Sequence, residues 1–112
     1  MEFTFQFLVI FFLDLKHAAP LLASLLALIG LLGYIIGRIE GWSLSDWLYH
    51  AFINATTVGY GDFRPSHGRT KFLAIMLAFI GLVFTGMVVA IALHAGNDAF
   101  GKVYEVGAFR DL

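Results

Sequence analysis

Two long apolar runs dominate the pattern of hydrophobic and polar positions along the chain. The first covers 18–36, about 19 residues, and the second covers 72–93, about 22 residues. At about 1.5 Å per residue, a helix of either length crosses a hydrocarbon core of about 30 Å. The pattern therefore predicts two membrane-spanning helices, an outer helix over 18–39 and an inner helix over 70–94.

A third apolar stretch, 3–13, precedes these runs and is too short to cross a membrane as a helix. It has no basic residue before it and no small-residue cleavage site after it, so we expect it to be retained rather than cleaved as a signal. We predict that residues 1–17 form a segment at the membrane interface. Because this segment is apolar nearly all round, burial in lipid or packing on a partner stays open as an alternative.

The segment between the two spans, 41–71, is too polar to cross the membrane and too long to be a simple turn. Ser43 or Ser45 can cap a short helix over 45–56, because a serine hydroxyl accepts a hydrogen bond from the free N–H groups of a first turn. The sequence T-V-G-Y-G-D follows at 57–62. The pattern thus favours an all-α membrane protein with a short helix and a loop between its spans.

Glycines alternate with larger residues in the loop over 57–61. If successive carbonyl oxygens are to point at one axis, the backbone must alternate between conformations of opposite hand, and glycines such as Gly59 and Gly61 enter the left-handed ones without steric cost. Such oxygens, with the Thr57 hydroxyl, can replace the water shell of a monovalent cation. Since one chain with two spans cannot surround this loop, several copies must assemble around it.

The stretch L-Y-H-A-F-I-N-A-T-T-V-G-Y-G-D, at 48–62, resembles the pore helix and signature filter of potassium channels. The resemblance extends over about 18–94 and is closest to the channels with two membrane helices per subunit. It implies two transmembrane helices with a re-entrant pore helix and filter loop, assembled as a fourfold homotetramer. It also implies passive flux of K⁺ across the cell membrane and both termini in the cytoplasm.

The resemblance also assigns roles to single residues. Asp62 would lie at the outer mouth of the pore and Thr56 behind the filter, at the base of the pore helix. K⁺ would be the permeant ligand, bound chiefly by the first four filter residues, with no cofactor. The residues that would line the ion sites are Thr57, Val58, Gly59, Tyr60 and Gly61.

The sequence departs from the family pattern beside the filter. Some channels place a glutamate behind the filter, hydrogen-bonded to the aspartate, whereas this chain has Ile53 there, so Asp62 lacks that partner. Many members carry aromatic residues where this chain has Tyr49 and His50. Two interpretations of His50 stay open, a hydrogen bond to Tyr60 or the filling of space.

Five glycines lie inside the predicted spans, where each costs about 1 kcal/mol relative to alanine. Gly33 and Gly37, four residues apart, allow another helix to approach closely, or are simply common in membrane helices. Gly81 lies nineteen residues after Asp62, which matches the hinge glycine of the family's inner helix. Gly86 can share the bending, and close helix packing is the alternative role for Gly81.

Composition supports a membrane and narrows the function. The chain is 60% hydrophobic and 13% charged, so its polar residues cannot cover a small globule. A net charge of −1 gives no basic surface for nucleic acid. The absence of cysteine removes thiolate chemistry. No set of acid, base and nucleophile gathers at one site, so we predict neither an enzyme nor a small-molecule substrate.

The opening stimulus is not predicted by any motif. There is no arginine ladder like that of a voltage sensor, and the short cytoplasmic tail over 95–112 offers no regulatory domain. His17 and His94 fall near the cytoplasmic ends of the spans, where they serve either proton gating or the membrane interface. The alternative functions are a poorly selective cation channel and a small membrane scaffold that does not conduct.

Overall fold

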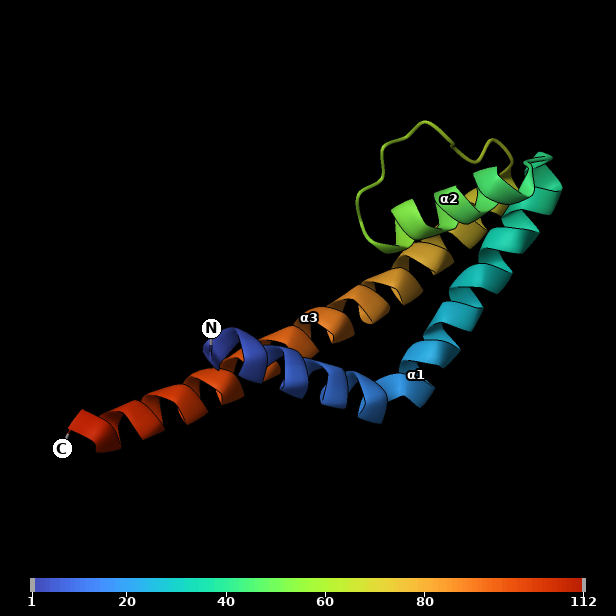
Figure 1. Cartoon of the computed structure of the whole chain (residues 1–112). Coiled ribbons are helices and arrows are strands. Elements are labelled where there is room, and N and C mark those ends of the chain that lie inside the picture. The colour runs from blue at the N-terminus through green and yellow to red at the C-terminus, as the bar shows by residue number, and fades with distance from the viewer. Residues whose placement is uncertain (1, 112) are drawn as a thin grey trace. The chain divides into compact units, whose positions relative to one another are not determined.

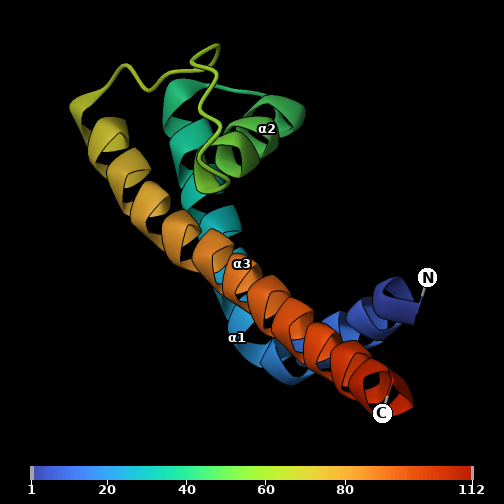
Figure 2. The same ribbon diagram turned by 90° about the vertical axis from the view of Figure 1, so that its left-hand side faces the viewer.

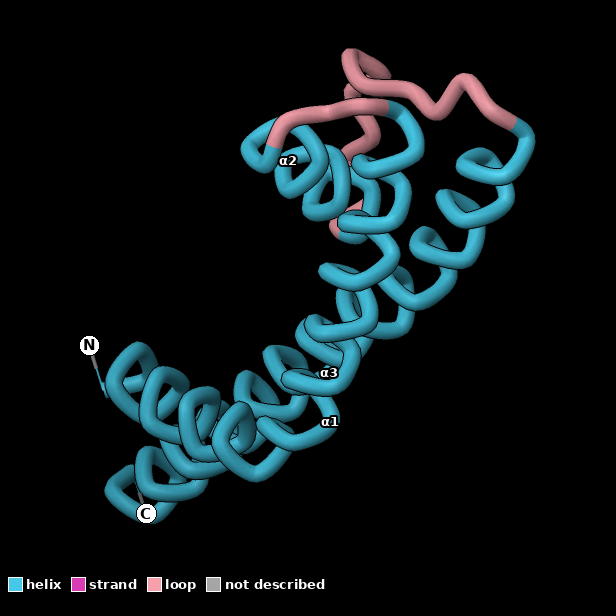
Figure 3. The backbone as a smooth tube through the Cα atoms, turned by 90° about the vertical axis from the view of Figure 1, so that its right-hand side faces the viewer, coloured by secondary structure: helices cyan, strands magenta, loops and turns pink. Residues whose placement is uncertain are grey.

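The computed structural model describes residues 2–111, with side chains described through residue 103. It contains the helices α1 (Glu2–Glu40), α2 (Leu44–Ala55) and α3 (Gly68–Asp111), in that order (Figure 1). Within residues 2–111 there is no strand, and the non-helical backbone is confined to the two segments that join the helices (Figure 3). The predicted all-α fold is confirmed.

Two helices are long and apolar enough to cross a membrane, namely α1 and the part of α3 over Gly68–Val103. Both are longer than the predicted spans. The polar residues near position 15 interrupt the hydrophobic pattern but not the helix, and the His17 ring bonds the Leu13 carbonyl at 2.8 Å within it. Pro20 therefore lies inside α1 rather than in the first turn of a separate helix. The segment predicted as a tail continues α3.

The chain forms two compact units. One is Leu21–Gly86, which holds the second part of α1, all of α2, the loop and the first part of α3. Its core is the meeting point of the three helices, and burial of this apolar surface is the main force that holds them together. The fully or nearly fully buried side chains of this core are Ile29, Leu32, Ile36, Ala51, Ala55 and Leu77.

Close contact between α1 and α2 depends on two glycines. A Cβ atom at Gly33 would overlap Ala51, and one at Gly37 would overlap the ring of Trp47. Figures 1 and 2 both show α2 lying beside the second part of α1. The prediction of close helix approach at these glycines is confirmed, and the approaching helix is the chain's own α2.

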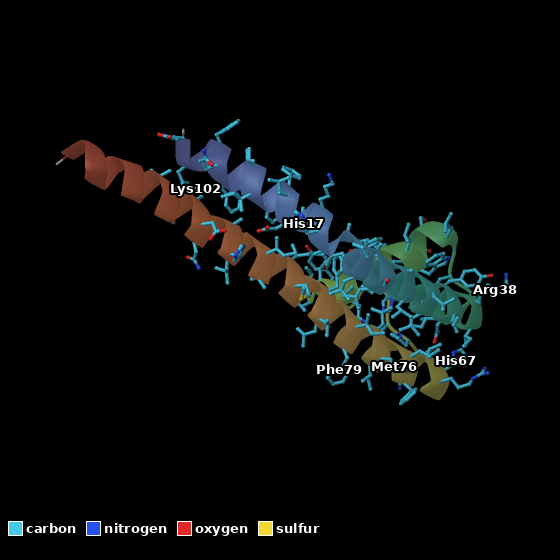
Figure 4. The ribbon with its side chains drawn as sticks, turned by 90° about the horizontal axis from the view of Figure 1, so that it is seen from below. His17, Arg38, His67, Met76, Phe79 and Lys102 are labelled. Carbon is cyan, nitrogen blue, oxygen red and sulfur yellow. The ribbon has the colours of Figure 1, made fainter. Side chains whose placement is uncertain are left out.

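The other unit consists of residues 2–20 and the part of α3 that begins at Met87. Here the first part of α1 lies along α3 (Figures 1 and 4). Phe3, Phe7 and Phe11 pack with Ile10 against the small side chains of α3 in this region. The N-terminal segment therefore packs within the chain itself, and its place at the membrane interface stays a prediction.

Candidate functional site

The loop at 57–62 begins where α2 ends, so the ends of α2 position the site. Ser43 has an extended backbone and its Oγ accepts the Asp46 N–H at 3.4 Å, which identifies Ser43 rather than Ser45 as the cap. Thr56 closes the other end, because its N–H and Oγ1 both donate to the Phe52 carbonyl, at 2.9 and 2.7 Å. The helix therefore runs one residue earlier than predicted at each end.

The loop is fastened to the last turn of α2 by its own backbone. The N–H groups of 57–59 donate to the carbonyl oxygens of Asn54 and Ile53, at 3.1 to 3.2 Å. All peptide bonds in the described chain are trans, and a trans peptide points its C=O opposite to its N–H. The carbonyl groups of 56–58 therefore point away from α2, toward the open side of the loop.

The backbone of the loop alternates in hand along its length. The φ angle is positive at Thr57 (69°), Gly59 (57°) and Gly61 (80°) and at no residue between them. The prediction that the two glycines adopt left-handed conformations is confirmed. Thr57 was not expected to join them, because a β-branched residue at positive φ costs about 1–3 kcal/mol. The loop thus carries strain at the residue where it leaves α2.

The loop is open on one side in the single chain. The side chains of Val58 and Tyr60 are 50% and 70% exposed. A cavity of about 310 Å³ lies between α2, the loop and α3, and His50 and Ala78 are among its lining residues. An apolar loop this exposed is an incomplete surface, which a lipid or another protein surface must cover.

Aromatic side chains support the loop from behind. Trp42 packs edge to face with the rings of His50 and Phe63, at centroid distances of 4.9 and 5.5 Å. Tyr49 meets Phe63 at 6.1 Å. Such edge-to-face pairs add about 0.5–1.5 kcal/mol each beyond their buried area. The cluster fixes the start of the segment that follows Asp62.

Asp62 has a different neighbour from the one missing at Ile53. Burial and the nearby Asp62 carboxylate raise the pKa of the Tyr49 hydroxyl, and the Phe63 N–H donates to Asp62 Oδ1 at 3.1 Å. Tyr49 was noted in the sequence only as a departure from the family pattern. The position of Tyr49 on α2, one turn before Ile53, puts the two residues on the same face of the helix. This spacing could have indicated that Tyr49 lies near Asp62.

His50 is buried, with 8% of its surface exposed. Its Nδ1 atom has no hydrogen-bond partner among the described residues of one chain. No bond between His50 and Tyr60 forms within the chain, so the proposed bond stays a prediction about neighbouring copies. Such a buried polar atom without a partner costs about 1–3 kcal/mol.

Sequence reasoning missed the role of Glu40, the last residue of α1. Its side chain is 5% exposed and accepts hydrogen bonds from Ser66, His67 and Thr70, at distances of 2.5 to 3.2 Å. Figure 4 shows His67 at this end of the unit. The carboxylate satisfies N–H groups at the start of α3, where a negative charge is favourable. The sequence S-H-G-R-T before an apolar run indicated that a helix starts here, and the N–H groups of a helix start need an acceptor.

The pKa of the Glu40 carboxyl shows how strong this arrangement is. Burial raises it, but the hydrogen bonds from Thr70, Ser66 and His67 outweigh burial and hold it well below its usual range. The carboxylate therefore stays charged at any ordinary pH. It ties the end of α1 to the start of α3, on either side of α2 and the loop.

The two candidate hinge glycines have different surroundings. A Cβ atom at Gly81 would overlap Ala55 of α2, both its backbone and its side chain. At Gly86 a Cβ atom would meet nothing within 4 Å. Close packing, the alternative that was left open, is therefore the structural role of Gly81. Hinge motion at either glycine stays a prediction.

Comparison with known proteins places these features in a family. A family model described as "ion channel" matches residues 21–96. "Two pore potassium channel a" of Oryza sativa is 36% identical over 92 residues, which cover 82% of this chain and 25% of that protein. "Potassium channel protein 1" of Methanocaldococcus jannaschii is 35% identical over 65 residues, 58% of this chain and 18% of the relative.

A further relative is the "TWiK family of potassium channels protein 7" of Caenorhabditis elegans, 33% identical over 55 residues, 49% of this chain and 10% of that protein. The match thus spans a quarter or less of the length of these three relatives. No solved structure matches the chain. The family model covers most of the first apolar run, all of the second, α2 and the loop. The chain therefore belongs to this family of ion channels, which are membrane proteins and not enzymes.

Proposed function

We propose that the chain is a subunit of a potassium-selective channel that conducts K⁺ passively through a homotetrameric pore. The observation that carries the proposal is the loop backbone. Its φ angle is positive at every second residue from 57 to 61, and its first N–H groups are held by α2. Carbonyl oxygens directed away from α2 then form one row that can face a central axis.

In the proposed pore, four such rows surround the axis and coordinate a dehydrated K⁺ through oxygens of Thr57, Val58, Gly59 and Tyr60. No charged group or cofactor is required, because carbonyl and hydroxyl oxygens are sufficient ligands for a monovalent cation. Several copies are needed because irregular backbone at membrane depth must be buried in protein or line a wet cavity, and the number four follows from the resemblance to potassium channels.

The exposed apolar surface supports a membrane assembly. Met76 and Phe79 project from α3 away from α1 (Figure 4), and they are 40% and 67% exposed. Lipid and neighbouring copies would cover this surface. We further propose that the protein lies in the cell membrane with both termini in the cytoplasm, so that the end of α1 at Glu40 lies at the outer mouth.

The test is ion flux in liposomes that contain only the purified protein. The proposal expects a reversal potential that follows the K⁺ gradient in mixed K⁺ and Na⁺, with block by Ba²⁺. A current without preference for K⁺ would identify a poorly selective cation channel. An absence of flux from a protein that has assembled correctly would favour a non-conducting scaffold.

A glycine variant tests the role of the loop backbone. Gly59→Ala places a Cβ atom at a φ of 57°, which costs about 1–2 kcal/mol, so we expect loss of K⁺ selectivity or of flux. Gly68→Ala is the matched control, because Gly68 has no close neighbour and no positive φ. Equal selectivity in both variants would contradict the proposed site.

A further inference from the structure

The carbonyl groups at the end of α2 need hydrogen-bond donors from outside the regular helix, because the last four carbonyl groups of a helix lack N–H partners within it. In α2 these groups belong to residues 52–55. The N–H groups of 56–59 donate to the oxygens of Phe52, Ile53 and Asn54, at 2.9 to 3.2 Å. The chain that follows α2 thus satisfies three of the four carbonyl groups.

The fourth carbonyl group, that of Ala55, has its partner on another helix. Thr85 of α3 donates its hydroxyl to the Ala55 oxygen at 2.9 Å. No backbone N–H of the loop donates to this oxygen in the described part of the chain. Since Ala55 is 1% exposed, bulk water has no access that would let it replace the hydroxyl. The cap of α2 is therefore completed by α3.

Thr85 makes this bond in place of a local one. A threonine inside a helix can turn its hydroxyl to a carbonyl oxygen of its own preceding turn, but its single hydroxyl hydrogen here points to α2. Gly81, one turn earlier, makes this possible, because a Cβ atom at Gly81 would overlap Ala55. The close approach at Gly81 lets a short side chain bridge the two helices.

A second hydrogen bond joins the same turn of α2 to α3. The Asn54 amide donates to the Ala74 carbonyl at 3.3 Å, and Ala74 lies about three turns before Thr85 along α3. The two bonds differ in what they fix. The Asn54 bond anchors a side chain, whereas the Thr85 bond anchors the backbone of α2 itself.

The peptide group that joins Ala55 to Thr56 is consequently held at both ends. Its carbonyl accepts from Thr85, and its N–H donates to the Phe52 carbonyl, both at 2.9 Å. The next residue, Thr57, has a φ of 69°, a strained conformation for a β-branched residue. A peptide group fixed at both ends cannot rotate to relieve this strain, so the oxygens of Thr57 keep their direction.

We propose that Thr85 is a positioning residue of the filter, whose hydroxyl caps the Ala55 carbonyl and so sets the direction of the Thr57 oxygens. The proposal rests on the proposed function, because it takes Thr57 as a ligand of K⁺. Thr85 acts through Ala55 and does not touch the ion. Loss of the hydroxyl leaves a buried acceptor without a partner, a state that folded proteins avoid, so the peptide group turns toward another donor.

The first test observes the hydrogen bond and does not depend on conduction. Ala55 and Thr56 form the only Ala-Thr pair in the sequence, so ¹³C at alanine carbonyls and ¹⁵N at threonines give one cross-peak by solid-state NMR in liposomes. Hydrogen bonding deshields a carbonyl carbon. Thr85→Val, which keeps the shape of the side chain without the hydroxyl, should therefore move this carbonyl resonance upfield, and Thr85→Ser should return it toward the wild-type position.

The matched control for this resonance is Thr4→Val, the same chemical change at an exposed position of α1, and it should leave the cross-peak in place. Thr85→Ala takes the place of Thr85→Val if the valine variant does not assemble. An Ala55 carbonyl resonance that stays unchanged without the Thr85 hydroxyl would overturn the cap.

The second test measures the K⁺ to Na⁺ permeability ratio from reversal potentials in liposomes. Thr85→Val should lower this ratio on the order of fivefold, the factor that corresponds to one neutral hydrogen bond. Thr85→Ser should recover most of the ratio, and Thr4→Val should leave it unchanged. Equal ratios in Thr85→Val and Thr85→Ser would overturn the positioning role. A wild-type protein without preference for K⁺ would instead contradict the proposed function, and the carbonyl resonance would still decide whether Thr85 caps α2.

Discussion

At the scale of single residues, Glu40 shows how one carboxylate organises the outer end of the filter-bearing unit. It is nearly buried, yet it has donors from Ser66, His67 and Thr70 around it. A buried carboxylate surrounded by donors is stable because both of its oxygens accept hydrogen bonds. An amide in its place has only one acceptor oxygen, and its NH₂ group would face the donors. The contact joins residues 26 to 30 positions apart, so no local pattern in the sequence reveals it.

Glu40→Gln is predicted to destabilise the protein by about 2 kcal/mol, because it replaces hydrogen bonds to a charged acceptor with weaker or unmade ones. The measurement is the thermal dissociation of the assembly in detergent. Glu2→Gln is the matched control, since Glu2 is exposed at the start of α1, and it should leave the transition unchanged. A Glu40→Gln protein as stable as this control would show that the buried charge contributes nothing.

The pH dependence of this contact follows from the lowered pKa of Glu40. A carboxyl whose folded pKa lies below its unfolded value of about 4.3 adds stability that is present above that value and lost as pH falls through the folded pKa. Between pH 5 and 8 the contribution of Glu40 should therefore be constant. A loss of stability in that window that disappears in Glu40→Gln would contradict the assignment.

At the scale of elements, the contact between the first part of α1 and the end of α3 is predicted to respond to pH. His94 Nδ1 lies 3.0 Å from Asp14 Oδ2, and the other ring nitrogen lies 3.6 Å from Asp98 Oδ2. A protonated imidazole donates from both nitrogens and attracts both carboxylates, whereas a neutral one donates from only one nitrogen. The contact should be tightest in mild acid.

Spin labels can be attached through cysteines introduced at the exposed Thr4 and Asn97, because the chain has no cysteine of its own. Pulsed dipolar spectroscopy then measures the distance distribution between the two labels from pH 5.5 to 8.5, and this distribution should broaden as pH rises. His94→Gln should remove this dependence. His17→Gln is the matched control, because His17 bonds only within its own helix among the described contacts, and it should keep the dependence. A distribution that is constant with pH in the wild-type protein would exclude a proton-sensitive contact here.

The hydrophobic pattern alone could predict the number of helices and most of their positions, because a run of about 20 apolar residues has the length of a membrane-spanning helix. It could not predict that α1 and α3 continue past the apolar runs. Asp14 and Lys16 are polar without being helix breakers, and Gly96 is only weakly unfavourable in a helix. The ends of these elements are decided by packing of the N-terminal phenylalanine side chains on α3, which depends on residues more than 80 positions away.

The candidate site also has features that the sequence could predict and features that it could not. The left-handed conformations of Gly59 and Gly61 could be predicted because they follow from glycine itself. The closeness of Tyr49 to Asp62 and the strain at Thr57 could not, because they arise only when α2 and the loop are folded together. Gly81 shows the limit of resemblance, since its match in position says nothing about the Ala55 contact.

At the scale of the whole molecule, the single chain leaves one polar atom that assembly should satisfy. His50 Nδ1 is buried without a partner in the described chain, and Tyr60 is 70% exposed. A hydroxyl can supply one hydrogen bond to a neutral imidazole nitrogen. We predict that Tyr60 of one copy donates to His50 of the adjacent copy, which would close the ring of subunits around the filter.

A double-mutant cycle with Tyr60→Phe and His50→Phe tests this bond, because each change removes one partner and keeps an aromatic ring. Each single variant should lower the stability of the assembly by about 1 kcal/mol, and the double variant should be little worse than either one. Tyr34→Phe combined with His50→Phe is the control pair, since Tyr34 packs on Trp47 within its own chain, and those effects should simply add. If the effects of Tyr60→Phe and His50→Phe also add, the two residues do not interact, and His50 only fills space beside Trp42.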